Sequence, residues 1–243
     1  MNTKTLQILT LASGPILLNA CGRGGKKSTP TPDTHTTAPE ATSITHNGTT
    51  YGFVTSPHTG KIWLDRNLGA ARVCESFDDV ACYRDYYQWG RNADGHEDSQ
   101  SGTSFNMTSN VFDAGTNRFI TSGGDWASVD TSGATRSAIW SRTADNSVCP
   151  TGFRVPTSTE ILAETVDVGV VNRVDAFENF LKLPSTGFRH STNGNLISDG
   201  STGYIWTSSV SGVESLRIRF TNTNINSSDN NRGHGEPVRC IKN

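Results

Sequence analysis

The sequence predicts an exported α+β domain held by disulfides, with short antiparallel strands and two or three helices. Three observations support this class. Thr157 and Glu160 form a capping box that begins a helix in the middle of the chain. Apolar and polar residues alternate strictly over 216–220, as in a half-buried strand. Setting aside Cys21 leaves four cysteines, an even number suited to an oxidising compartment.

The N-terminal segment indicates export. An apolar stretch at 6–18 is too short to span a bilayer and has the length of a signal peptide's hydrophobic region. It ends in Leu18-Asn19-Ala20-Cys21-Gly22, which resembles the lipobox of bacterial lipoproteins, although Asn19 departs from the pattern. We therefore expect residues 1–20 to be a lipoprotein signal peptide. Cys21 is expected to carry the lipid anchor, which contains palmitate. Gly22 after the lipidated cysteine favours the outer membrane by the same resemblance. An ordinary signal peptide that happens to carry a cysteine is the alternative.

Two regions follow the anchor. Residues 21–43 are rich in Gly, Thr and Pro and lack apolar periodicity, so they are expected to form a disordered tether. Residues 44–243 are enough for one domain with a core of ordinary size. The net charge of −2 offers no basic field, so we expect no nucleic-acid partner.

The first half of the domain combines strands, one helix and a long loop. Strands are expected at 50–55 and 61–64, on either side of a turn-like Pro-His-Thr-Gly. The aromatic stretch 80–89 is expected to be a helix. Residues 94–137 are rich in Gly, Ser, Asn and Asp and are expected to form a long loop packed on the body, a feature that is often functional.

The second half passes from helices to strands. The capped helix is expected to reach residue 168, and a second helix is expected at 174–181. Short strands are expected at 185–189, 195–198, 203–208, 215–220 and 238–241. Within 216–220, we expect Leu216, Ile218 and Phe220 to face the core, whereas Arg217 and Arg219 point outward together.

The four domain cysteines allow three disulfide pairings. We favour Cys74 with Cys82, which closes a short local loop, and Cys149 with Cys240, which ties the middle of the domain to its end. Metal binding is the competing explanation, but no two cysteines have CxxC spacing and no histidine lies beside them at ligand spacing. The sequence therefore predicts no metal and no cofactor.

Six segments, taken in order, resemble the Fibrobacter succinogenes major paralogous domain family. The resemblance covers about 60–243 and implies a C-type-lectin-like fold, related to the formylglycine-generating enzyme fold. Domains of this fold are similar to the targets of diversity-generating retroelements, in which Asn codons are randomised at C-terminal surface positions. The six segments are GKIWLDRNLGA (60–70), CYRDYYQWGR (82–91), CPTGFRVPT (149–157), LPSTG (183–187), YIWTSS (204–209) and VRCIK (238–242).

The resemblance and the Asn-rich end of the chain together predict a ligand-binding surface. Its partner is expected to be a protein or glycan on another surface, because Asn, Ser and Arg provide adaptable hydrogen bonds, as in antibody paratopes. We expect the Asn-rich run to be an exposed loop, so that replacing Arg217, Arg219, Asn230 and Asn231 together by Ala should leave stability almost unchanged. The candidate positions are Arg217, Arg219, Thr221, Asn224, Asn226, Ser228, Asp229, Asn230, Asn231, His234 and Glu236.

Other classes of function remain open. Glu236-Pro237 resembles part of a calcium-lectin sugar motif, but Val238 stands in its third position. The acidic run 94–98 offers oxygen ligands without the spacing of a known calcium loop. A catalyst of the formylglycine-generating type would need free thiols, and no nucleophile elbow, zinc or P-loop motif is present. We therefore predict a binding protein with no catalytic residue, and keep a structural envelope lipoprotein as the alternative. His190 and His234 are expected to lie at the surface. The aromatic residues of 83–89 are expected in the core, with a stacking platform as the alternative.

Overall fold

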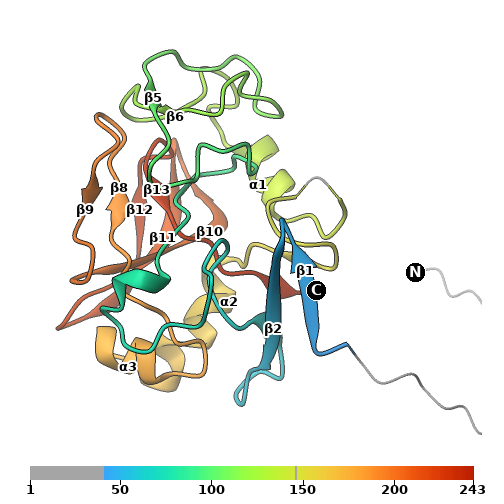
Figure 1. The fold of residues 1–243 in the computed structure, drawn as a ribbon, viewed down its shortest axis with the longest axis vertical. Helices are drawn as coiled ribbons and strands as arrows, with labels where there is room; N and C mark the ends of the chain where they lie inside the picture. The colour runs from blue at the N-terminus through green and yellow to red at the C-terminus, as the bar shows by residue number, and fades with distance from the viewer. Residues whose placement is uncertain (1–40, 146) are drawn as a thin grey trace, which may run out of the picture. The chain divides into compact units, whose positions relative to one another are not determined.

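The computed structural model describes residues 41–145 and 147–243. Most of its regular structure is antiparallel strands, with few helices and two disulfides, which confirms the α+β class (Figure 1). The predicted signal peptide, Cys21 and most of the tether lie outside the described residues. Ser43, assigned to the tether, begins the first strand. Among the described residues, no helix has the length and hydrophobicity needed to cross a membrane.

One sheet joins the two ends of the domain. Its strands run in the order β1-β2-β3-β14-β7, so the C-terminal strand lies between β3 from the first half of the domain and β7 from the second half. Its members are β1 (Ser43–His46), β2 (Thr49–Thr55), β3 (Ile62–Leu64), β14 (Ile241–Lys242) and β7 (Phe153–Arg154). The disulfide between Cys149 and Cys240 joins the segments that lead into β7 and β14, which are neighbours in this sheet. The disulfide between Cys74 and Cys82 closes a local loop. Both predicted pairings are confirmed.

Two further sheets position the C-terminal part of the chain. A sheet of β10 (Gly203–Ser211), β11 (Glu214–Phe220) and β12 (Ile225–Asn230) forms a simple antiparallel meander. Beside it, β13 (Gly235–Glu236) lies between β4 (Tyr87–Gln88) and β8 (Phe188–Arg189), with β9 (Leu196–Ile197) at the edge. A short parallel pair, β5 (Thr103–Ser104) and β6 (Phe119–Ile120), lies in the long central loop region.

The described helices are short. The capping box is confirmed: Thr157 accepts from the backbone of Glu160, whose carboxylate accepts from the backbone of Thr157. The described α-helices are α1 (Ala134–Trp140), α2 (Ser158–Ala163) and α3 (Arg173–Glu178), and 3₁₀ turns lie at Val80–Cys82 and Val166–Val168.

The core is built around the tryptophans. All five are fully buried, together with Ile218 and Phe220. Tyr86 and Tyr87 are also buried and Tyr83 is half-buried, so most of the aromatic residues of 83–89 serve the core and not an exposed stacking platform. Leu216, predicted to face the core with Ile218, is only half-buried.

The capped helix ends at Ala163, short of the expected residue 168, and two predicted elements differ from the structure in kind. Residues 80–89 form only a 3₁₀ turn followed by β4, because Tyr87 and Gln88 pair with Glu236 and Gly235. Aromatic residues favour strands, and this long-range pairing decides the outcome. The Asn-rich run is also a strand, β12, and not a loop, because it completes the sheet beside β11.

Buried polar side chains hold the long region 94–137 against the body. The amide of Gln88 donates to Ile120 O over 2.8 Å and accepts from Ile120 N over 3.1 Å. Arg91 donates to the carbonyls of Thr116 and Arg118. Because such side chains satisfy the loop's backbone groups, this region can be ordered with little regular secondary structure.

Candidate ligand-binding face

One face of the three-stranded sheet gathers five of the predicted binding residues. Residues directly opposite one another on neighbouring strands share a face. The register aligns Trp206, Arg217 and Ser228 in one row, and Tyr204, Arg219 and Asn226 in the next. Asn230 lies opposite Ser215, on the same side. We call Arg217, Arg219, Asn226, Ser228 and Asn230 the arginine face.

The two arginines of this face have different surroundings. Arg217 lies 4.6 Å above the ring of Tyr204, donates to Glu236 over 2.6 Å and contacts Ser228 over 3.4 Å. Arg219 is half-buried, and its guanidinium makes no hydrogen bond or ion pair within the described part of the chain. Arg217 is therefore tied into the fold, whereas Arg219 keeps its donors free.

Glu236 lies on the same side of the sheet as the arginine face, against Arg217 and Asn230. Its side chain is fully buried, and Oε1 accepts from Arg217 and, over 2.8 Å, from Asn230. Its Oε2 is buried and has no partner in the described structure. Burial raises the pKa of this carboxyl, and the charge and hydrogen bond of Arg217 oppose that rise. The expectation of an exposed Glu236 is wrong.

The turn between β11 and β12 holds two more predicted residues. Thr221 Oγ1 accepts from the backbone of Thr223 and Asn224, and it is 2.7 Å from Asn224 Oδ1. Thr221 therefore shapes the turn, as hydroxyl side chains commonly do. Asn224 is exposed, so the other atoms of its amide can meet a ligand.

The remaining predicted residues do not share this face. Asp229 is exposed but lies opposite Leu216, on the side of the sheet where Ser227 meets Ser158 of α2. Asn231 is half-buried. His234, expected at the surface, is only 7 % exposed.

His234 belongs to a small aromatic wall beside the arginine face. Its ring lies 4.9 Å from those of Phe188 and His190, and Phe188 lies 5.2 Å from Tyr204. Its Nδ1 accepts from the backbone of Ser191. Burial, followed by the charges of His190 and Arg217, lowers the pKa of His234 to about 4. Sequence reasoning missed Tyr204 and Phe188 as neighbours of the site. The alternation within 203–208 would place Tyr204 with Trp206 on one face, but nothing local indicates the contact with Phe188.

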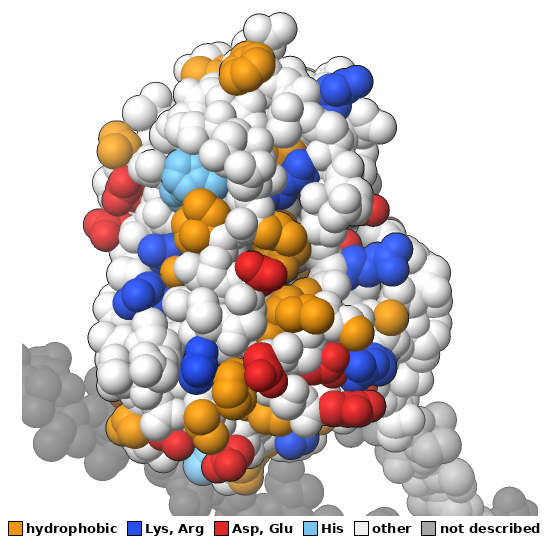
Figure 2. Space-filling view, turned by 60° about the vertical axis from the view of Figure 1, so that its left-hand side comes forward, with side chains coloured by type: hydrophobic (Ala, Val, Ile, Leu, Met, Phe, Trp, Pro, Cys, Tyr) orange, Lys and Arg blue, Asp and Glu red, His pale blue; other side chains and the backbone are white. Residues whose placement is uncertain are grey.

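The side of the molecule that carries β8 and β9 shows mixed chemistry. Figure 2 brings this side forward and shows basic, acidic and hydrophobic side chains interspersed, without a large patch of one kind. Such a surface provides many different hydrogen-bonding groups. It does not resemble a uniformly charged surface for a polyanion.

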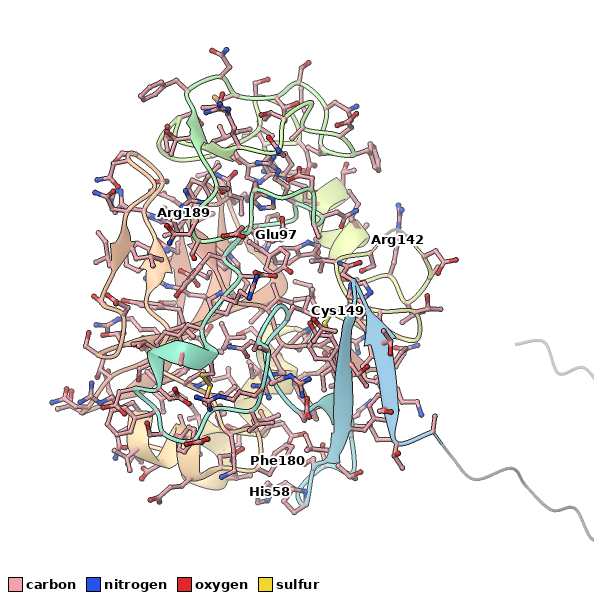
Figure 3. All side chains as sticks on the ribbon, viewed as in Figure 1. His58, Glu97, Arg142, Cys149, Phe180 and Arg189 are labelled. Atoms are coloured by element: carbon pink, nitrogen blue, oxygen red, sulfur yellow. A yellow bond between two sulfur atoms is a disulfide. The ribbon has the colours of Figure 1, made fainter. Side chains whose placement is uncertain are left out.

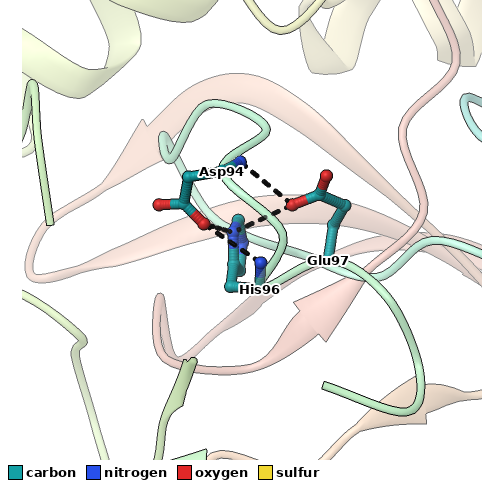
Figure 4. Close-up of side chains that lie close together, drawn as sticks. All are labelled: Asp94, His96 and Glu97. Atoms are coloured by element: carbon teal, nitrogen blue, oxygen red, sulfur yellow. Dashed lines mark hydrogen bonds and ion pairs between the residues drawn. The ribbon is translucent and has the colours of Figure 1, made fainter. Parts of the chain in front are cut away.

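A second cluster, Asp94, His96 and Glu97, has the residue types of a metal site (Figure 4). His96 is fully buried, and its Nε2 accepts the backbone N–H of Gln88 over 3.1 Å. A neutral imidazole that accepts at Nε2 carries its proton on Nδ1, which then donates to Asp94 over 2.8 Å. Because Nδ1 has no lone pair to give a cation in this arrangement, the cluster is better explained as a hydrogen-bonded group that fixes the start of the 94–137 region against β4.

The described cysteines offer no reactive thiol. Cys74, Cys82, Cys149 and Cys240 all lie in disulfides, and a catalyst of the formylglycine-generating type would need a free one. The arginine face itself presents hydrogen-bond donors and acceptors suited to recognition. Comparisons of this chain with protein-family models, with curated proteins and with solved structures find no match.

Proposed function

We propose that this chain is a lipid-anchored bacterial surface protein that binds a macromolecular ligand, a protein or glycan on another surface, through the arginine face. One observation carries the proposal. Arg219 and the exposed Asn226 stand side by side on a rigid sheet, and the guanidinium of Arg219 has no partner among the described residues. An unpaired cation held in place by a packed sheet is more useful for binding than for stability.

The packing beneath the face supports this role. Ile218 and Phe220, which alternate with the two arginines along β11 and so lie on its other side, are fully buried, so the backbone that carries the arginine face is fixed. Rigid strands with adaptable Asn, Ser and Arg side chains combine pre-organisation with varied hydrogen bonding. This combination of a fixed frame and adaptable surface side chains also supports a C-type-lectin-like fold whose surface residues are varied by a diversity-generating retroelement. Arg219, Asn224 and Asn226 are the positions that the fold constrains least.

A binding assay with a matched control tests the proposal. Full-length chain is incubated with bacterial and host cells and with arrays of surface proteins and glycans. Asn226→Trp places a bulky neutral side chain on the arginine face. Asn106→Trp makes the same change at an exposed position in the long central region. We expect Asn226→Trp to reduce binding at least tenfold and Asn106→Trp to leave it unchanged. Equal binding by both variants would refute binding through the arginine face, and no binding by the unmodified chain would favour a structural envelope lipoprotein.

Two further experiments address the anchor and the variability. Radiolabelled palmitate should label the chain in a bacterial host, and Cys21→Ala should abolish that label. The DNA downstream of the gene should hold a near-copy of its 3′ end, with adenines at the differing positions, beside a reverse transcriptase gene. If neither is present, the arginine face is a fixed binding surface and the retroelement proposal fails.

A further inference from the structure

An open pocket lies at the end of the arginine face, beside the turn between β11 and β12. Its volume is about 470 Å³, within the range of small-molecule sites. Two arginines, Arg173 from α3 and Arg219 from β11, line it together with six uncharged polar residues. None of the described residues that line it is acidic or apolar.

Both arginines keep their positive charge unpaired. Arg173 Nη1 donates to the carbonyl of Ser201 over 2.6 Å, and its guanidinium lies 4.6 Å above the ring of Phe77. Its Nε is buried without a partner in the described structure. Neither Arg173 nor Arg219 is in an ion pair with a described carboxylate, so the pocket contains two cations that no side chain of its wall neutralises.

The acidic residues that act on the same phenol as Arg173 lie outside the pocket wall. Burial is the main cause of the raised pKa of Tyr83, Asp78, Asp79 and Asp199 raise it further, and Arg173 lowers it. None of these three acids lines the pocket.

The uncharged part of the wall is rich in hydroxyl and amide groups. Asn222, Thr223 and Asn224 are exposed at the turn, and Thr202 lines the pocket with them. These groups can both donate and accept hydrogen bonds, as sugar hydroxyls require. An acidic peptide would bring apolar groups that find no apolar wall to contact.

We propose that this pocket binds the anionic group of an acidic carbohydrate, with Arg173 and Arg219 pairing the carboxylate or sulfate and the Thr and Asn side chains meeting the sugar hydroxyls. The inference rests on the proposed function, because it names the ligand class for one end of the arginine face. Planar guanidinium groups suit such anions through paired N–H donors.

Calorimetric titration of the full-length chain tests this assignment. The probes are trigalacturonate for a sugar carboxylate, a sulfated chondroitin disaccharide for a sugar sulfate, galactotriose for a neutral sugar and triglutamate for an acidic peptide. At least one acidic sugar should bind, and galactotriose and triglutamate should bind at least tenfold more weakly. Arg219→Gln should weaken acidic-sugar binding at least tenfold without a change in thermal stability, because Arg219 has no partner in the described fold.

A control variant and a second pocket variant sharpen the test. Arg142→Gln removes an exposed arginine beside α1, on the side of the molecule away from β8 and β9, and should bind normally (Figure 3). Arg173→Gln should also weaken binding. No binding of either acidic sugar, equal binding of galactotriose or triglutamate, or normal binding by Arg219→Gln would overturn the assignment. If no acidic sugar binds but Asn226→Trp still reduces cell binding, the proposed function stands without this assignment. Acidic-sugar binding with cell binding unaffected by that variant would refute the proposed function instead.

Discussion

Arg217 on β11 donates a hydrogen bond of 2.6 Å to the carboxylate of Glu236, which is fully buried against the same side of the sheet. Asn230 donates to the same oxygen. Two residues that the sequence assigns to an exposed surface therefore also stabilise a buried charge. The arginine face consists of a structural half around Arg217 and Asn230 and a free half around Arg219 and Asn226.

The first prediction compares the two arginines. Arg217→Ala should lower the free energy of unfolding by about 3 kcal/mol, because it leaves Glu236 buried with only Asn230 as a partner. Arg219→Ala should change it by less than about 0.5 kcal/mol. Urea unfolding of both variants measures the difference, and similar small effects would show that Glu236 does not depend on Arg217. This prediction reverses the expectation from the sequence. That expectation was that replacing both arginines, Asn230 and Asn231 together by Ala would leave stability almost unchanged.

The second prediction concerns pH. In the unfolded chain His234 titrates near the ordinary histidine pKa of 6.5, whereas burial holds the folded pKa at about 4. The unfolded chain therefore binds more protons between these values, so the stability contributed by neutral His234 is complete above pH 6.5 and is lost as pH falls toward 4. The raised pKa of Glu236 acts in the opposite direction, because its protonation in acid relieves a buried charge.

His234→Asn should separate these two effects. The Asn side chain can still accept from Ser191 but cannot take up a proton, so the loss of stability between pH 7 and pH 4.5 should shrink by about 2 kcal/mol. Urea unfolding at the two pH values provides the measurement. An unchanged loss would assign the acid sensitivity to other groups.

Local patterns in the sequence predicted much of the frame. The capping box at Thr157 depends on a short motif and the strand containing Ile218 on simple alternation, and the structure contains both. The Cys149–Cys240 link, one of the three pairings that four cysteines allow, is also present. The strand at Tyr87 and the burial of Glu236 were not predicted, because both depend on pairing between β4 and β13, far apart in the chain. The pocket was not predicted for the same reason, since α3 and β11 each provide one of its arginines.

The third prediction compares the disulfides. Cys149 and Cys240 are 91 residues apart and Cys74 and Cys82 are 8 apart. Loop-closure entropy therefore makes the longer link worth about 2 kcal/mol more. Cys149→Ser should lower the urea midpoint further than Cys74→Ser, measured under the same oxidising conditions. Equal midpoints would mean that the two links constrain the unfolded chain alike.

The fourth prediction concerns Arg232, a fully buried residue within the polar C-terminal run. Its guanidinium donates to the carbonyls of Thr131, Gly212 and Glu214 and to the hydroxyl of Ser215, and it lies 5.0 Å from the ring of Trp89. It therefore fixes the β10–β11 hairpin against the loop before α1. Sequence reasoning treated its neighbours as surface residues and assigned it no role.

Arg232→Lys should cost about 3 kcal/mol, although it keeps the charge. An ammonium group cannot reproduce the planar set of donors, so several buried carbonyls lose their partners. Arg142→Lys makes the same change at an exposed position and should alter stability by less than about 0.5 kcal/mol. Urea unfolding of both variants measures the contrast. Equal stabilities would mean that water satisfies the carbonyls as well as Arg232 does, and the hairpin would then be held by its apolar side chains alone.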